Sequence, residues 1–158
     1  MRAPSARALR RALNLYPPLL FAGIRVLEIA DDWRGARVVL RRRWYNRNYV
    51  GTHFGGSLFA MTDPFWMILT LRCLGSGYTV WDKAGEIEFV APGRADVYAE
   101  FHVDDAMLDD LRAATAGGDK ALRWCTTEVR TAAGDVVARV RKQLYVRRKR
   151  DRPADPAG

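Results

Sequence analysis

Cysteine is scarce in this chain, and its two cysteines form no recognisable pattern. Cys73 and Cys125 make neither a CxxC pair nor the spacing of a zinc site. The two histidines, His53 and His102, also stand far apart in the sequence with no ligand cluster around them, so we expect no metal site. Few cysteines without a disulfide framework are typical of a reducing compartment, and we expect the protein to be cytoplasmic.

The sequence also lacks a hydrophobic run that could cross a membrane. The longest apolar stretch, 58–71, is interrupted at Asp63 and is shorter than the about 20 residues of a spanning helix. Arginines before an apolar segment at the N-terminus are typical of a signal peptide, but Pro17 and Pro18 interrupt that segment and no cleavage pattern follows. The apolar spacing favours an amphipathic helix over about 5–16 instead.

Acidic residues are fewer than basic ones, which gives a net charge of +8. A basic excess suggests an anionic partner, and both nucleic acid and the phosphates of coenzyme A fit it. The aromatic residues do not interleave with the basic clusters, which argues against nucleic acid. The basic run 147–150 leads into a proline-containing tail, and we expect 149–158 to be disordered.

Length and composition indicate one domain over 1–148. Alternating apolar residues between turn signals predict about six antiparallel strands, and 104–116 has the spacing of a short helix or excursion. The predicted strands are 23–30, 36–42, 78–90 (one strand or two), 96–103, 121–130 and 135–147. A helix over 56–74 is apolar nearly all round. We therefore predict an α+β fold in which a curved antiparallel sheet wraps around one central helix.

One carboxylate interrupts the apolar helix. Between 49 and 71, Asp63 carries the only full charge. An ionised aspartate in such a segment must be paired, hydrogen-bonded or functional. It could cap a helix that begins at Pro64, or it could be a catalytic group. Because proline has no N–H, the helix is also expected to kink beside Asp63.

The residues around Asp63 resemble those of hotdog-fold acyl-CoA thioesterases. The run Asn-x-Asn-x-x-Gly-Thr-x-Phe-Gly-Gly-Ser at 46–57, the Asp-Pro at 63–64 and the Val-Trp-Asp-Lys at 80–83 are similar to a bacterial branch described as tetrameric acyl-CoA thioesterases. The spacing from Gly56 to Asp63 is also that of the phenylacetyl-CoA thioesterase-like branch. The likeness covers about 9–148 and implies the hotdog fold.

The resemblance implies hydrolysis of a fatty or aryl acyl-CoA to free acid and coenzyme A, with coenzyme A as part of the substrate and no other cofactor. It makes Asp63 the base or nucleophile and the N–H of Gly55 the oxyanion donor. Gly56 would allow the substrate to approach closely. Asn48 matches an asparagine that could orient water or the thioester carbonyl, although a turn-forming role fits equally well.

Several further residues are candidate substrate contacts. They are Thr52, His53, Phe54, Lys83, Arg139 and Arg141. Phe54 stands where the phenylacetyl-CoA branch has a histidine, and His53 lies one position earlier, which would alter substrate fit or lower activity. For Lys83 a solvent-facing position is favoured. Alternation puts Arg139 and Arg141 on one face of a strand, from which they could meet the phosphates of coenzyme A.

Two other functions stay open. A non-catalytic acyl-CoA or lipid-binding protein would explain the departure at Phe54. A hydratase or dehydratase of acyl thioesters would use a His-Phe-Pro run, but here His53-Phe54 lacks the proline. A single sheet around one helix leaves an outer face and an edge strand free, so we expect a homodimer or homotetramer with sites at subunit interfaces.

Overall fold

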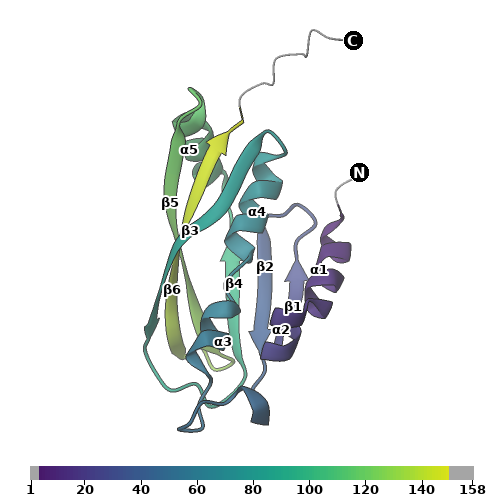
Figure 1. Ribbon diagram of the computed structural model, residues 1–158, viewed down its shortest axis with the longest axis vertical. Helices are drawn as coiled ribbons and strands as arrows, with labels where there is room; N and C mark the ends of the chain where they lie inside the picture. The colour runs from purple at the N-terminus through teal and green to yellow at the C-terminus, as the bar shows by residue number, and fades with distance from the viewer. Residues whose placement is uncertain (1–3, 150–158) are drawn as a thin grey trace.

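The computed structural model describes residues 4–149 as a six-stranded antiparallel sheet that curves around helices (Figure 1). The strands are β1 (Ile24–Ile29), β2 (Gly35–Leu40), β3 (Tyr78–Phe89), β4 (Val97–His102), β5 (Lys120–Thr131) and β6 (Val136–Arg148). The helices are α1 (Ala6–Leu15), α2 (Pro17–Ala22), the 3-10 turn η1 (Trp44–Asn46), α3 (Gly55–Ala60), α4 (Phe65–Leu74) and α5 (Asp105–Thr115). The predicted α+β architecture with six strands is confirmed.

The sheet order is β1-β2-β4-β5-β6-β3, which places β3 at an edge, next to the last strand of the chain. Segment 78–90, which the sequence allowed as one strand or two, forms one strand with a register shift between Asp82 and Ala84. Along strands such as β4 and β6, buried and exposed residues alternate with the period of two that the sequence shows. In β6 the side chains of Val140 and Leu144 are buried toward the helices, whereas Arg139 is exposed on the other face.

The central helix predicted over 56–74 is two helices, α3 and α4, separated by a break at 61–64. The cause is local. Pro64 has no N–H to donate to the carbonyl of Ala60, which accepts instead from the backbone N–H of Asp63 at 3.1 Å. The hydroxyl of Thr62 donates to the carbonyl of Phe59 at 2.8 Å and tightens the same turn. The kink expected at the proline is therefore a full break.

Helix α4 covers the middle of the sheet with its apolar side (Figure 1). Phe65 and Leu69 are each 1% exposed. The ring of Phe65 stacks on Phe101 of β4 with 5.0 Å between ring centres, and Trp66 meets the same ring edge-on at 5.7 Å. These contacts fix the C-terminal side of the break against the sheet.

The N-terminal helix predicted over about 5–16 is confirmed as α1, and the short helix α2, which the sequence analysis did not predict, follows it. Ser5 caps α1 by accepting from the N–H of Ala8 at 3.2 Å, and Pro17 opens α2, where proline is favoured. Among residues 4–149, no helix is long and apolar enough to span a membrane. The segment 149–158, predicted to be disordered, lies outside the described residues except for Lys149, whose backbone N–H donates to the carbonyl of Gly77 at 2.8 Å.

Candidate functional site

The loop that leads into α3 is held together by the side chain of Asn48. Its Oδ1 accepts from the backbone N–H of Thr52 at 3.0 Å, and its Nδ2 donates to the hydroxyl of Thr52 at 2.8 Å and to the carbonyl of His53 at 3.3 Å. Both ends of the amide are therefore engaged within the loop. The structure shows the turn-forming role of Asn48, and its catalytic role stays a prediction.

His53 is buried beneath this loop, with 2% of its surface exposed. Its Nε2 lies 2.7 Å from the carbonyl oxygen of Ala95. Because a carbonyl only accepts, Nε2 carries the proton and Nδ1 is the free acceptor. Nδ1 has no hydrogen-bond partner among the described residues. Burial lowers the pKa of His53, with the Ala95 hydrogen bond opposing, so the ring is neutral at physiological pH.

The two glycines that begin α3 make room for two phenyl rings. A Cβ atom at Gly55 would lie 2.8 Å from the ring of Phe89, and one at Gly56 would lie 2.4 Å from the ring of Phe54. Both phenylalanines are 57% exposed. Because Gly55 and Gly56 open a helix, their N–H groups have no carbonyl one turn earlier in that helix to bind.

A cavity of about 460 Å³ lies where this loop faces the end of β3. That volume is in the range of small-molecule sites. The lining residues are Asn48, Val50, Thr52, His53, Gly55, Leu58, Phe89, Val90, Ala91, Pro92, Gly93 and Arg94. The structure thus brings together four of the predicted site residues around one cavity.

Asp63 lies in the break between α3 and α4. The expectation of an apolar setting is wrong for the single subunit, because the broken helix leaves the Asp63 side chain 64% exposed. Its Oδ1 accepts from Nζ of Lys142 at 2.6 Å. The capping alternative has no support among the described residues, because no side chain makes a capping hydrogen bond to the start of α4.

Lys142 is the partner that the sequence interpretation missed. It is 4% exposed on the inner face of β6, and its Nζ also lies 3.5 Å from Oδ2 of Asp82 on β3. Burial raises the pKa of Asp82, the Lys142 ammonium opposes that rise, and the Asp63 carboxylate adds to it. The burial of Lys142 could have been predicted from the sequence, because the alternation of β6 puts it on the same face as the apolar Val140.

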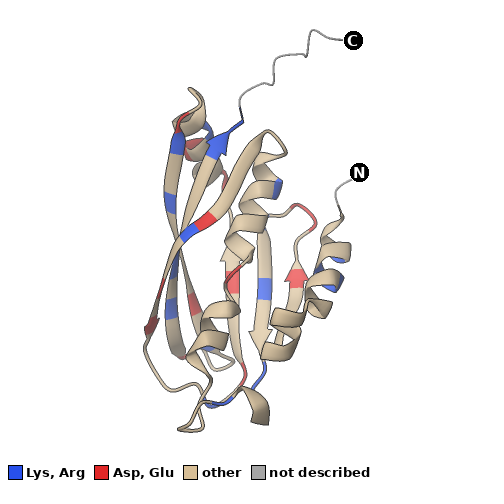
Figure 2. Cartoon of the chain, viewed as in Figure 1, with Lys and Arg blue, Asp and Glu red and all other residues tan. Residues whose placement is uncertain are grey.

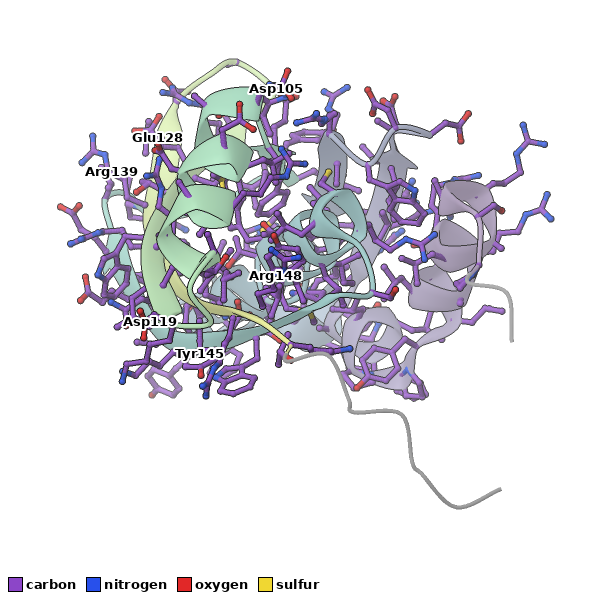
Figure 3. The ribbon with its side chains drawn as sticks, turned by 90° about the horizontal axis from the view of Figure 1, so that it is seen from above. Asp105, Asp119, Glu128, Arg139, Tyr145 and Arg148 are labelled. Atoms are coloured by element: carbon purple, nitrogen blue, oxygen red, sulfur yellow. The ribbon has the colours of Figure 1, made fainter. Side chains whose placement is uncertain are left out.

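The remaining predicted contacts, like Asp63 itself, are not among the residues that line the cavity. Lys83 is exposed. Arg139 and Arg141 are on the outer face of β6, where Arg139 Nε donates to Glu128 at 3.0 Å and Arg141 Nη1 donates to Glu86 at 3.2 Å. Figure 3 shows Arg139 and Glu128 on the outside of the sheet, turned away from its centre. Their contact with coenzyme A stays a prediction.

Charge is unevenly distributed over the elements that surround the site. Figure 2 shows α3 without charged residues and α4 nearly so, whereas basic residues are spread along the strands and α1. Within residues 4–149, no three His, Cys, Asp or Glu side chains come together in a way that could hold a metal ion. The polar groups described above are carboxylates, an ammonium, an imidazole and backbone N–H groups.

Comparisons with known proteins agree with this architecture. A crystal structure from Pseudomonas aeruginosa, named a protein of unknown function and "Probable Thioesterase", superposes with a TM-score of 0.81 at 19% identity over 94% of this chain and 98% of that one. A thioesterase from Haemophilus influenzae gives 0.68 at 14% identity over 97% of each chain. A mutant thioesterase from Pseudomonas aeruginosa gives 0.66 at 12% identity over 93% of this chain and 96% of that one.

These identities are low, so the three likenesses establish the fold. A search of curated proteins found no match. A family model described as "Domain of unknown function (DUF4442)" matches residues 5–146, which is nearly the whole chain. The chain belongs to the DUF4442 family and has the hotdog fold of these thioesterase structures.

Proposed function

We propose that this protein hydrolyses an acyl-CoA thioester to a free acid and coenzyme A. The observation that carries the proposal is the Asp63 carboxylate, which is exposed at the break of the central helix and held by a buried lysine. A carboxylate in this position can remove a proton from water. The fold shared with proteins named as thioesterases supports the same reaction.

In the proposed reaction, Asp63 takes a proton from a water molecule as the water oxygen adds to the thioester carbonyl carbon. The carbonyl oxygen gains negative charge, which the N–H of Gly55 at the start of α3 would stabilise. The carbon–sulfur bond then breaks, and the coenzyme A thiolate leaves and takes up a proton. The products are a carboxylic acid and free coenzyme A, so the reaction needs no cofactor.

The cavity beside Gly55 is the proposed place for the acyl group or the adjoining pantetheine arm. Its volume of about 460 Å³ suits a small or medium acyl chain, and Leu58 and Phe89 give it apolar walls. Phe54 remains the feature that would fit a binding protein without turnover. Hydrolysis is preferred because Asp63 has both an exposed side chain and a fixed partner.

We further propose that a second copy of the chain completes the site. Strand β3 ends the sheet, so one of its edges has no partner strand within the described residues. Large apolar side chains at the end of this strand, Phe89 and Val90, are 57% and 42% exposed, and both line the cavity. A second subunit would bury this surface.

We therefore expect the purified protein to be a dimer or a tetramer at micromolar concentration. Size-exclusion chromatography with light scattering should give a mass of two or four times the 17.9 kDa of one chain. A monomer at every concentration up to 100 times the working concentration of the assay would contradict the shared site. It would leave the hydrolysis proposal to be tested by turnover alone.

The hydrolysis proposal is tested with a panel of acyl-CoA substrates that vary in chain length and in aromatic or aliphatic character. Release of free thiol is followed with a chromogenic disulfide reagent, and the acid product is quantified by mass spectrometry. Thiol release together with acid supports a thioesterase. Water addition to an enoyl-CoA without thiol release would identify a hydratase, and saturable binding without either reaction would identify a binding protein.

A further inference from the structure

A single buried ammonium lies at the meeting point of three elements. Lysine is rarely fully buried without partners, yet Lys142 is 4% exposed. Its Nζ donates to Oδ1 of Asp63 at 2.6 Å, lies 3.5 Å from Oδ2 of Asp82, and lies 4.7 Å from the centre of the Phe59 ring. The partners come from the helix break, from the edge strand β3 and from α3, so the ammonium has little freedom to move.

The local backbone leaves space for this arrangement. Gly85 of β3 is the direct strand partner of Lys142, and the register of the two strands shifts just before it, between Asp82 and Ala84. A Cβ atom at Gly85 would lie 2.6 Å from the ring of Phe59 and 3.2 Å from Cδ of Lys142. Such bulges often re-aim side chains next to active sites. The glycine and the bulge together admit the lysine, the ring and the Asp82 carboxylate.

We infer that Lys142 is a positioning residue for Asp63 and that Asp82 anchors Lys142 from the opposite side. This inference rests on the proposed function. The hydrogen bond from Lys142 uses Oδ1 of Asp63, which fixes the rotamer of an otherwise exposed side chain and leaves Oδ2 open to a water molecule.

Asp82 has a separate role in the cluster that Lys142, Asp63 and Asp82 form. When Asp63 accepts a proton from water, its carboxyl group becomes neutral and no longer balances the charge of Lys142. A buried ammonium without a counter-charge is strongly unfavourable. Asp82 keeps a carboxylate oxygen 3.5 Å from Nζ and can balance that charge throughout the reaction.

Among the described residues, few other titratable groups influence the charges of Lys142, Asp63 and Asp82. Lys142 and Asp63 are the charged groups that influence Asp82. On the neighbouring strand β5, Cys125 lies directly opposite Lys142. Burial raises the pKa of Cys125 to about 12, with Arg123 opposing the rise, so this thiol is neutral at physiological pH. Lys142 is therefore the charged side chain that contacts Asp63 directly.

The first test replaces the ammonium with an uncharged side chain of similar length. Lys142→Met should lower kcat by about 10- to 100-fold with KM nearly unchanged, because a mispositioned catalytic group affects the chemical step. Lys120→Met, which removes an exposed lysine of β5, is the matched control and should change neither quantity.

The second test separates the two carboxylates. Asp82→Asn should lower kcat less than Lys142→Met does, since Lys142 still donates to Asp63. Circular dichroism and thermal unfolding of each variant check that it is folded. If a folded Lys142→Met protein keeps the parental kcat, or Asp82→Asn lowers kcat as much as Lys142→Met does, the inference is wrong.

The carbon-13 NMR chemical shift of the Asp63 carboxyl, measured at one neutral pH in the parent and in Lys142→Met, tests the hydrogen bond from Lys142 without any substrate. If the parent hydrolyses no thioester but this signal shifts in the variant, the proposed function fails while the pairing of Lys142 with Asp63 stands. If the parent turns over and the signal does not shift, the positioning inference fails by itself.

Discussion

Replacing Asp63 with asparagine should reduce acyl-CoA hydrolysis about 100-fold or more while the protein stays folded. A general base contributes about 100- to 10,000-fold to a reaction of this kind, and an amide cannot accept the proton. The fold should tolerate the change because the Asp63 side chain is 64% exposed and asparagine has the same shape. The loss should appear in kcat, because Asp63 is proposed to act in the transition state.

The matched control for this substitution is Asp109→Asn on α5. That aspartate is also exposed and also accepts a hydrogen bond from a basic residue, Arg112, at 2.8 Å, but neither residue of this pair takes part in the ion pairs of Lys142. Initial rates over a range of acyl-CoA concentrations should show parental values for Asp109→Asn. A folded Asp63→Asn protein with near-parental kcat would remove Asp63 from the mechanism.

The second large effect concerns stability. Phe65→Ala should lower the free energy of unfolding by about 3–5 kcal/mol, which is typical when a fully buried phenylalanine is truncated. Phe65 is 1% exposed and stacks on Phe101, so its loss leaves a cavity between α4 and the sheet. This cavity would also loosen the end of the helix break that carries Asp63.

Urea denaturation at fixed protein concentration measures this effect, since an oligomer's stability depends on concentration. Phe21→Ala is the control, because Phe21 is 75% exposed and its truncation leaves no cavity. We expect its unfolding midpoint to stay close to that of the parent. If the urea unfolding midpoint of Phe65→Ala equals that of the parent, the packing of α4 against the sheet does not stabilise the core.

Much of the fold could be predicted from the sequence because strands and turns depend on local patterns. Alternation with a period of two located all six strands, and glycine at position 75 marked the end of α4. The break at 61–64 was predicted only as a kink. Its extent depends on the tight turn in which Asp63 donates to Ala60 and Thr62 to Phe59, and apolar periodicity does not record such bonds.

The site was less predictable because its key contact joins distant parts of the chain. Asp63 stood out as a lone charge, but its partner Lys142 is 79 residues away. Strand alternation placed Lys142 on the inner face, yet only the pairing of β3 with β6 brings Asp82 to the same ammonium. Arg139 and Arg141 were predicted to meet the phosphates of coenzyme A, and the sheet places them on the outer face with their own carboxylates.

The most direct measurement is a single-turnover reaction with the protein in excess over its best acyl-CoA substrate. The mixture is quenched at intervals, and free thiol, free acid and intact acyl-CoA are quantified together. We predict one thiol and one acid for each acyl-CoA consumed, with a rate that falls about 100-fold in Asp63→Asn. Intact acyl-CoA recovered from a saturated complex, or equal rates in the parent and in Asp63→Asn, would contradict hydrolysis through Asp63.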